Sequence, residues 1–247
     1  MTPEHLALIE SVPLRDGAVI ESSNIDYGDF EGYYAYDSSI EGPLPTVVII
    51  HDWTGLRSYP KARAQMLARL GYAAVCVDVY GRGIRFTSHE DAAAEAGKYY
   101  GDLSLMRSRV AAGFSFAASL PFVDESRMVV IGYCFGGSAA IEFARTGSRA
   151  RGFVTVHGGL ITHSPADVSS ISAPLLILTG GSDDVVPDAA IQAFTDELRT
   201  RDDIDWQVNI YAGAPHAFTL PGIPAYRATA DRRSWTALLQ FLGEVLG

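Results

Sequence analysis

A cysteine lies between closely spaced glycines in GYCFGG, residues 132–137. Gly132, Cys134 and Gly136 form the pattern G-x-C-x-G, a sharp turn that can hold a nucleophile at its tip, here with cysteine where serine is usual. An apolar run precedes the turn and a helix-like stretch follows it. The start of that helix would favour a thiolate on Cys134. The alternative is that Cys134 is a small buried hydrophobic residue, which is the common fate of a free cysteine.

Two later stretches supply the groups that a thiol nucleophile needs. GGSDDVVP, residues 180–187, contains Asp183, and APHAF, residues 214–218, contains His216. An imidazole can take up and return a proton at the sulfur, and a carboxylate can orient the imidazole. Each of the three residues follows its own apolar run. The order nucleophile, acid, histidine therefore predicts a triad of Cys134, Asp183 and His216.

This chemistry requires strands that end close together. Apolar runs rich in β-branched residues alternate with longer helix-like segments, which predicts an α/β fold: a mostly parallel sheet of about eight strands with helices on both faces. Strands are expected at 18–22, 31–37, 46–51, 73–80, 127–133, 152–158, 174–180 and 206–211, and helices at 59–71, 88–100, 102–120, 136–147, 188–200 and 228–246. The first two strands are too close for a crossover helix and are expected to be antiparallel. Ligands bind at the carboxyl ends of the strands in such sheets.

Length and charge narrow the range of partners. A chain of 247 residues can fold as one α/β domain, so a single domain is expected over residues 1–247. The formal net charge of −10 predicts no nucleic-acid partner and no anionic membrane surface. No run approaches the roughly 18 apolar residues of a membrane span. The N-terminus does not read as a secretory signal, and the two cysteines, Cys76 and Cys134, fit a reducing, cytoplasmic location.

The sequence resembles the dienelactone hydrolase family of α/β-hydrolases. The motifs that carry the resemblance are GYCFGG, GGSDDVVP and APHAF, with IIHDWTGL at 49–56 and GYAAVCVDVYGRG at 71–83. The resemblance implies an α/β-hydrolase fold and hydrolysis of a small ester or lactone of the dienelactone type through an acyl-enzyme. Cys134 would be the nucleophile, His216 the general base and acid, and Asp183 its orienting partner. The family pattern G-x-D-x-x-V-P favours Asp183 over Asp184.

The resemblance also implies residues around the nucleophile. The backbone amides of Phe135 and Trp53 would form the oxyanion hole, where each donor can contribute about 3 kcal/mol. Asp52 matches the position of an acid that holds the resting thiol. The family often has the longer glutamate there, and the alternative is that Asp52 only caps local backbone amides.

The sequence departs from the family at the residues that bind substrate. An arginine four residues after the catalytic histidine would hold an anionic lactone, and that position is Leu220 here. Arg82 and Arg85 follow a predicted strand and are candidates to replace it, the alternative being local ion pairs. His157 is a candidate to line the pocket, the alternatives being a structural hydrogen bond or packing.

These departures leave two other functions open. The first is a broad-specificity carboxylesterase or thioesterase, whose apolar acyl pocket Leu220, Phe218 and Trp53 would favour. The second is a non-catalytic protein that binds a small molecule on the same fold. We expect no cofactor and no metal, because the chain has no nucleotide-binding glycine motif and no cluster of ligands with metal-binding spacing. A monomer or small homo-oligomer is expected.

Overall fold

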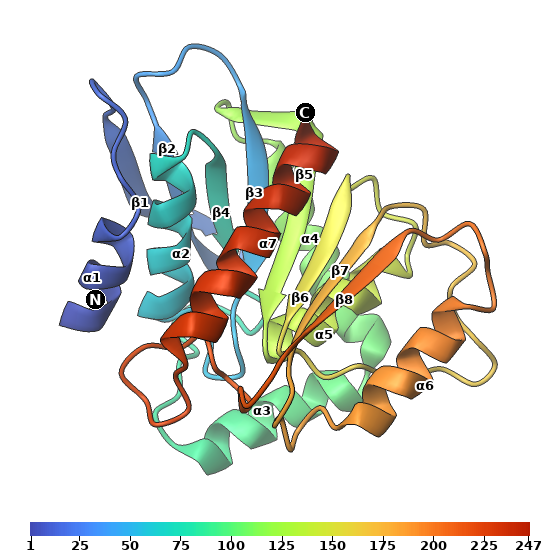
Figure 1. Cartoon of the computed structure of the whole chain (residues 1–247). Helices are drawn as coiled ribbons and strands as arrows, with labels where there is room; N and C mark the ends of the chain where they lie inside the picture. Colours follow the sequence, from blue (N-terminus) through green and yellow to red (C-terminus); the bar gives the residue numbers. More distant parts are fainter. The chain divides into compact units, whose positions relative to one another are not determined.

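The computed structural model describes all 247 residues, which form two units, residues 1–128 and 129–247 (Figure 1). The strands of the first unit are β1 (Ile20–Tyr27), β2 (Phe30–Asp37), β3 (Leu44–Ile50) and β4 (Ala73–Val77), in the order β1-β2-β4-β3. Its helices are α1 (Pro3–Glu10), α2 (Ser58–Arg69), α3 (His89–Gly101) and α4 (Leu103–Ala118). β1 and β2 form the predicted antiparallel hairpin, β2 is also antiparallel to β4, and β3 is parallel to β4.

Helices cover both faces of the sheet in the first unit. The Sγ atom of Cys76 in β4 donates to the carbonyl of Pro60 in α2. The next residue, Val77, packs instead against Gly113 of α4, where an added Cβ would lie 2.7 Å from the valine Cβ. Because successive strand residues point to opposite faces, α2 and α4 lie on opposite sides of this sheet, as Figure 1 also shows.

The second unit repeats this layering on parallel strands. Its strands are β5 (Val123–Tyr133, which begins in the first unit), β6 (Gly152–Val156), β7 (Leu175–Gly180) and β8 (Trp206–Tyr211), adjacent in that order and all parallel. Its helices are α5 (Phe135–Ala144), α6 (Asp188–Leu198) and α7 (Ala228–Leu246). Gly152 of β6 allows Phe241 of α7 to approach, while Gly137 of α5 approaches Thr155 on the other face.

The predicted fold class is confirmed: the chain is α/β, with eight mostly parallel strands and seven helices. β6 and β7 are buried along their whole length, as parallel strands covered on both faces require. The single domain expected over residues 1–247 stays a prediction.

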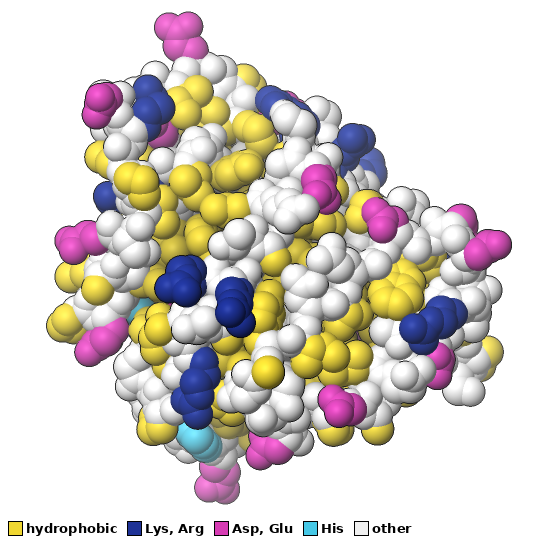
Figure 2. Space-filling model, viewed as in Figure 1, with side chains coloured by type: hydrophobic (Ala, Val, Ile, Leu, Met, Phe, Trp, Pro, Cys, Tyr) yellow, Lys and Arg dark blue, Asp and Glu magenta, His cyan; other side chains and the backbone are white.

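The surface carries both signs of charge. On the face that Figure 2 shows, some Lys and Arg side chains lie close together at the centre left, and the others are spread over the face among Asp and Glu side chains. None of the helices combines the length and the apolar character that crossing a membrane requires.

Candidate active site

Cys134 lies in a strained turn between β5 and α5. Its φ and ψ angles are 54° and −117°, a conformation that side-chain-bearing residues rarely adopt. The backbone amide of Cys134 donates to the carbonyl of Val156 at 3.0 Å, which ties the turn to β6. A Cβ at Gly132 would collide with the carbonyl of Gly136, so the strand and the helix can approach this closely only with glycine there. The turn holds the partly exposed Cys134 at the start of α5.

The other two predicted triad residues lie beside Cys134. Nε2 of His216 is 3.2 Å from Sγ of Cys134, and Nδ1 of His216 is 3.0 Å from Oδ2 of Asp183. The carboxylate of Asp183 is itself fixed, because its Oδ1 accepts the amides of Val185 and Val186, both at 2.9 Å. The three side chains therefore form one hydrogen-bonded line from carboxylate to sulfur, as nucleophilic catalysis requires.

The surroundings of His216 favour its protonated form. Burial by itself would lower the pKa of His216, but its hydrogen bonds to Asp183 and Cys134 and the charges of both residues outweigh burial and raise the pKa to about 10. Burial likewise would raise the pKa of Asp183, yet the hydrogen bond from His216 and the amides of Val185 and Val186 lower it. The raised pKa of His216 favours the imidazolium form at neutral pH, with Nε2 facing the sulfur, and the lowered pKa of Asp183 favours its carboxylate form.

Backbone hydrogen bonds hold the segment after β8, which carries His216, against the segment after β7, which carries Asp183. The amide of Ser182 donates to the carbonyl of Ala214 at 2.9 Å, and the amide of Gly181 donates to Tyr211 at 2.8 Å. The last residue of β7, Gly180, must be glycine at this position, because a Cβ would collide with the carbonyl of Ala214. The sequence analysis did not single out Gly180, although glycine directly after an apolar run was a signal for such a close approach.

The remaining candidates of the second unit differ in exposure. His157 is 1% exposed and Phe218 is 0% exposed, whereas Leu220 is half-buried. Nε2 of His157 is 2.7 Å from Oγ1 of Thr219, a partner that the sequence analysis did not identify. Phe135 is the first residue of α5 and directly follows the nucleophile. Substrate-binding roles for His157, Phe218 and Leu220, and an oxyanion role for Phe135, stay predictions.

Trp53 and Asp52 belong to the first unit. Oδ1 of Asp52 accepts both the amide of Thr54, at 2.8 Å, and its hydroxyl, at 2.6 Å, and the side chain is buried. The Trp53 ring packs edge-on against His89, with 5.2 Å between the ring centroids. The predicted roles of Asp52 toward the thiol and of Trp53 in the oxyanion hole stay predictions.

Arg82 and Arg85 are also in the first unit, and both have local partners. Arg82 forms an exposed ion pair with Asp26 at 3.2 Å. Arg85 donates to the backbone carbonyls of Leu56 and Ile84, both at 2.7 Å, and its guanidinium lies 3.5 Å from a carboxylate oxygen of Asp78. Their predicted substrate-binding role stays a prediction.

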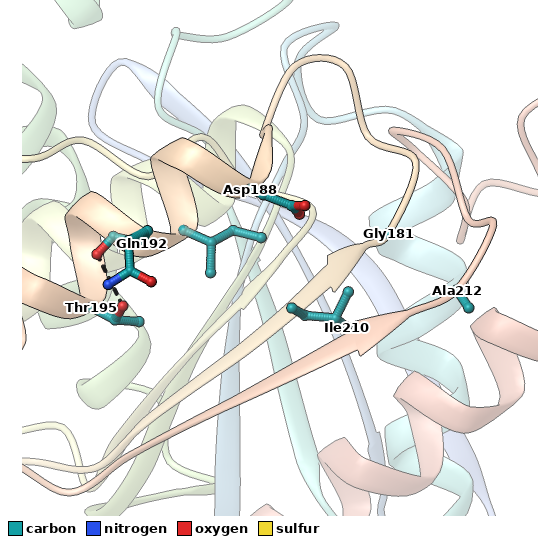
Figure 3. A pocket seen from close by; sticks show the side chains of 7 residues that line it. Gly181, Asp188, Gln192, Thr195, Ile210 and Ala212 are labelled. Atoms are coloured by element: carbon teal, nitrogen blue, oxygen red, sulfur yellow. Dashed lines mark hydrogen bonds between the residues drawn. The ribbon is translucent and has the colours of Figure 1, made fainter.

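An open hollow of about 440 Å³ lies elsewhere in the second unit, between α6 and β8 (Figure 3). Asp188, Gln192, Thr195 and Ile210 are among the residues that line it. None of Cys134, Asp183 and His216 does, so the hollow is separate from the triad. No group of three or more His, Cys, Asp or Glu side chains is placed to hold a metal ion.

Comparison with known proteins identifies the family of the chain. Residues 30–246 match the sequence profile of the dienelactone hydrolase family. A carboxymethylenebutenolidase from Pseudomonas putida is 27% identical over 213 residues, which are 83% of this chain and 88% of the relative. The crystal structure of a dienelactone hydrolase-like promiscuous phosphotriesterase from metagenomic libraries superposes with a TM-score of 0.87 and 36% identity, covering 94% of this chain and 100% of the other. An acylaminoacyl peptidase from Pyrococcus horikoshii, 15% identical with a TM-score of 0.66, shares the fold. The chain belongs to the dienelactone hydrolase family.

Proposed function

We propose that this hydrolase cleaves a small carboxylic ester or lactone through an acyl-enzyme formed on Cys134. The observation that carries the proposal is the line of hydrogen bonds from Asp183 through His216 to the sulfur, with 3.0 Å and 3.2 Å between the paired atoms. Membership of the dienelactone hydrolase family supports the same reaction class.

The first half-reaction follows from the position of the proton. The Cys134 sulfur attacks the carbonyl carbon as a thiolate, and the carbonyl oxygen becomes an oxyanion beside the start of α5, where the helix dipole favours negative charge. We assign the amide of Phe135 as one oxyanion donor; the second donor that the family resemblance implies, Trp53, stays a prediction. When the C–O bond breaks, the leaving alkoxide takes the proton from Nε2 of His216.

The second half-reaction reverses the role of the histidine. Acylation removes the charge of the sulfur, and with it part of what raises the pKa of His216. With a lower pKa, the imidazole that has given up its proton stays neutral near pH 7 and can accept a proton from water. It takes a proton from water as the oxygen attacks the thioester carbonyl, and the thiolate of Cys134 leaves. Asp183 keeps the imidazole oriented in both steps.

The chemistry of sulfur limits the substrates. An amide is a poor substrate, because the tetrahedral intermediate expels a thiolate more readily than an amine. Esters, thioesters and lactones remain. A neutral ester is the second candidate for the preferred substrate, because the half-buried Leu220 stands where the family resemblance expects an arginine for an anionic lactone.

The nucleophile is tested with iodoacetamide on the wild type and on Cys76→Ala. The turnover of a small ester should be lost on alkylation in both proteins, and Cys134→Ala should have no appreciable turnover without any reagent. Activity that survives full alkylation of Cys134 would overturn the proposal.

The substrate preference is tested with a panel. It compares kcat/KM for a neutral short-chain ester with that for an anionic dienelactone. It also includes a phosphotriester, because one similar solved structure is described as a promiscuous phosphotriesterase. A preference for the neutral ester favours the apolar acyl pocket, and a preference for the dienelactone favours the family's namesake reaction.

A further inference from the structure

His157 lies beside His216 without belonging to the predicted triad. β6 is the strand between β5, which leads to Cys134, and β7, which leads to the segment that carries Asp183. His157 directly follows β6, and its amide donates to the carbonyl of Leu178 in β7 at 2.8 Å. The register of the sheet therefore places its imidazole between the elements that carry the nucleophile and the acid.

The His157 ring packs against Tyr133, which precedes the nucleophile, and against residues of the segment 216–219. Its centroid is 5.3 Å from that of the His216 ring, edge to face at 66°, and 5.5 Å from that of Phe218 at 79°. It is 6.1 Å from the ring of Tyr133, the residue before the nucleophile. With the hydrogen bond from Nε2 to Oγ1 of Thr219 at 2.7 Å, it contacts three of the four residues from His216 to Thr219.

The segment that His157 contacts is strained. Cys134, His157 and Ala217 are the non-glycine residues of the chain with positive φ, at 54°, 42° and 59°. Such conformations are unfavourable for residues with a side chain and persist only where the surroundings enforce them. Ala217 lies between His216 and Phe218, so relaxation of its backbone would carry the catalytic imidazole with it. Thr219, which is 1% exposed, is the side chain through which His157 holds this segment.

We propose that His157 is a positioning residue, which acts with Thr219 to hold the segment 216–219 so that Nε2 of His216 is aligned with Sγ of Cys134. At 1% exposure, the His157 side chain is packed against the catalytic imidazole and has almost no surface for a substrate to touch. This inference rests on the proposed function, since the alignment matters only if Cys134 and His216 perform the chemistry.

The test compares Thr219→Val, which removes the hydroxyl and keeps the shape, with Thr219→Ser, which keeps the hydroxyl. For a small neutral ester, Thr219→Val should lower kcat about tenfold to a hundredfold with KM changed less than about twofold, because a small misplacement of a catalytic group is costly. Its kcat/KM should also fall off at a lower pH than that of the wild type, since a His216 that is less well aligned with Cys134 loses part of what raises its pKa. Thr219→Ser should retain the wild-type kcat and pH profile.

Other outcomes overturn the inference. A raised KM with unchanged kcat would make His157 and Thr219 substrate-binding residues, and wild-type values of both would leave them no positioning role. If Thr219→Val does not fold, His157→Gln is tested instead, by its kcat and KM relative to wild type and by its pH profile. Cys134→Ala is measured in parallel: turnover in that variant refutes the proposed function, whereas an inactive Cys134→Ala beside a fully active Thr219→Val refutes the positioning role alone.

Discussion

Among single residues, the two cysteines differ in burial and in hydrogen-bond partner. Cys76 is fully buried, its Sγ lies 3.3 Å from the carbonyl of Pro60, and burial raises the pKa of its thiol. Cys134 is partly exposed at the start of α5, with Nε2 of His216 3.2 Å from its sulfur. Only Cys134 has the electropositive, accessible surroundings of a reactive thiol.

In the proposed mechanism, the pKa of His216 sets the alkaline limit of activity. Because protonated His216 would supply the leaving group's proton, kcat/KM is expected to fall as pH rises through the His216 pKa of about 10. In Asp183→Asn, loss of the carboxylate removes a cause of the raised pKa, so the fall should move to lower pH. The kcat of this variant should drop about a hundredfold or more.

Asp184 provides the matched control for that variant. It is the next residue in the chain and is exposed, so Asp184→Asn should leave the pH profile unchanged and kcat within about twofold of wild type. Equal effects of Asp183→Asn and Asp184→Asn would contradict the assignment of the orienting acid.

Among the elements, the turn from β5 to α5 tolerates no side chain at Gly132. Gly132→Ala should lower the free energy of unfolding by about 3 kcal/mol or more, because the added methyl meets the backbone carbonyl of Gly136, which cannot move without unwinding α5. Gly97→Ala is the control: this exposed glycine lies within α3 with nothing near its Cβ, and the change should stabilise by about 0.5–1 kcal/mol. Urea unfolding measures both, and a neutral Gly132→Ala would refute the steric argument.

A buried arginine connects α5 to α6 and to the β6–β7 connection. Arg145 donates to Glu197 at 2.6 and 3.0 Å and to the carbonyls of Asp167 and Ile161, and its Nε lies 3.1 Å from Glu142. Arg145→Met leaves both buried carboxylates without this cation and should cost about 3–5 kcal/mol. The control, Asp196→Asn, breaks an exposed ion pair with Arg199 and should leave Tm unchanged. Equal Tm values for the two variants would contradict a structural role for the buried pair.

The sequence predicted the parts of the fold and site that have local signals. Apolar runs gave the eight strands, and the residues after three of them gave Cys134, Asp183 and His216, which the structure brings together. The list of helices omitted α1, which has only eight residues and whose signals were a single short apolar run and the Thr2 cap with proline at the next position. The contact between His157 and Thr219 joins residues 62 apart in the chain. No local pattern encodes such a contact, because it depends on the order of the strands.

For the whole molecule, shifted pKa values predict a stability maximum between mildly acidic and mildly alkaline pH. Burial would raise the pKa of Asp37, but hydrogen bonds from Ser39, Val19 and Arg15 lower it to about 2, and the pKa of Asp183 is lowered too. The stability from such carboxylates is present above the unfolded pKa of about 4 and is lost as pH falls through the folded value. The raised pKa of His216 has the opposite effect on stability. Its contribution to the free energy of unfolding is complete below the unfolded pKa of about 6.5 and is lost as pH rises through the folded pKa of about 10.

A thermal-unfolding series at constant ionic strength tests this balance. We expect Tm at pH 3 to be about 10 °C or more below its value at pH 6, and a second decline above pH 9. The second decline should shrink in His216→Gln, which lacks the titrating imidazole. A Tm that is flat from pH 3 to pH 10 would show that these groups have the same pKa values in the folded and unfolded chain.

In the proposed mechanism, the reaction proceeds through an acyl group on Cys134. This intermediate can be measured by mass spectrometry of the protein after it is quenched in acid during turnover of an activated ester, first intact and then digested. An acyl-enzyme gives a mass increase equal to the acyl group, located on the peptide that contains Cys134 and absent in Cys134→Ala. Turnover without any acylated protein, or with the acyl group on another residue, would contradict this mechanism.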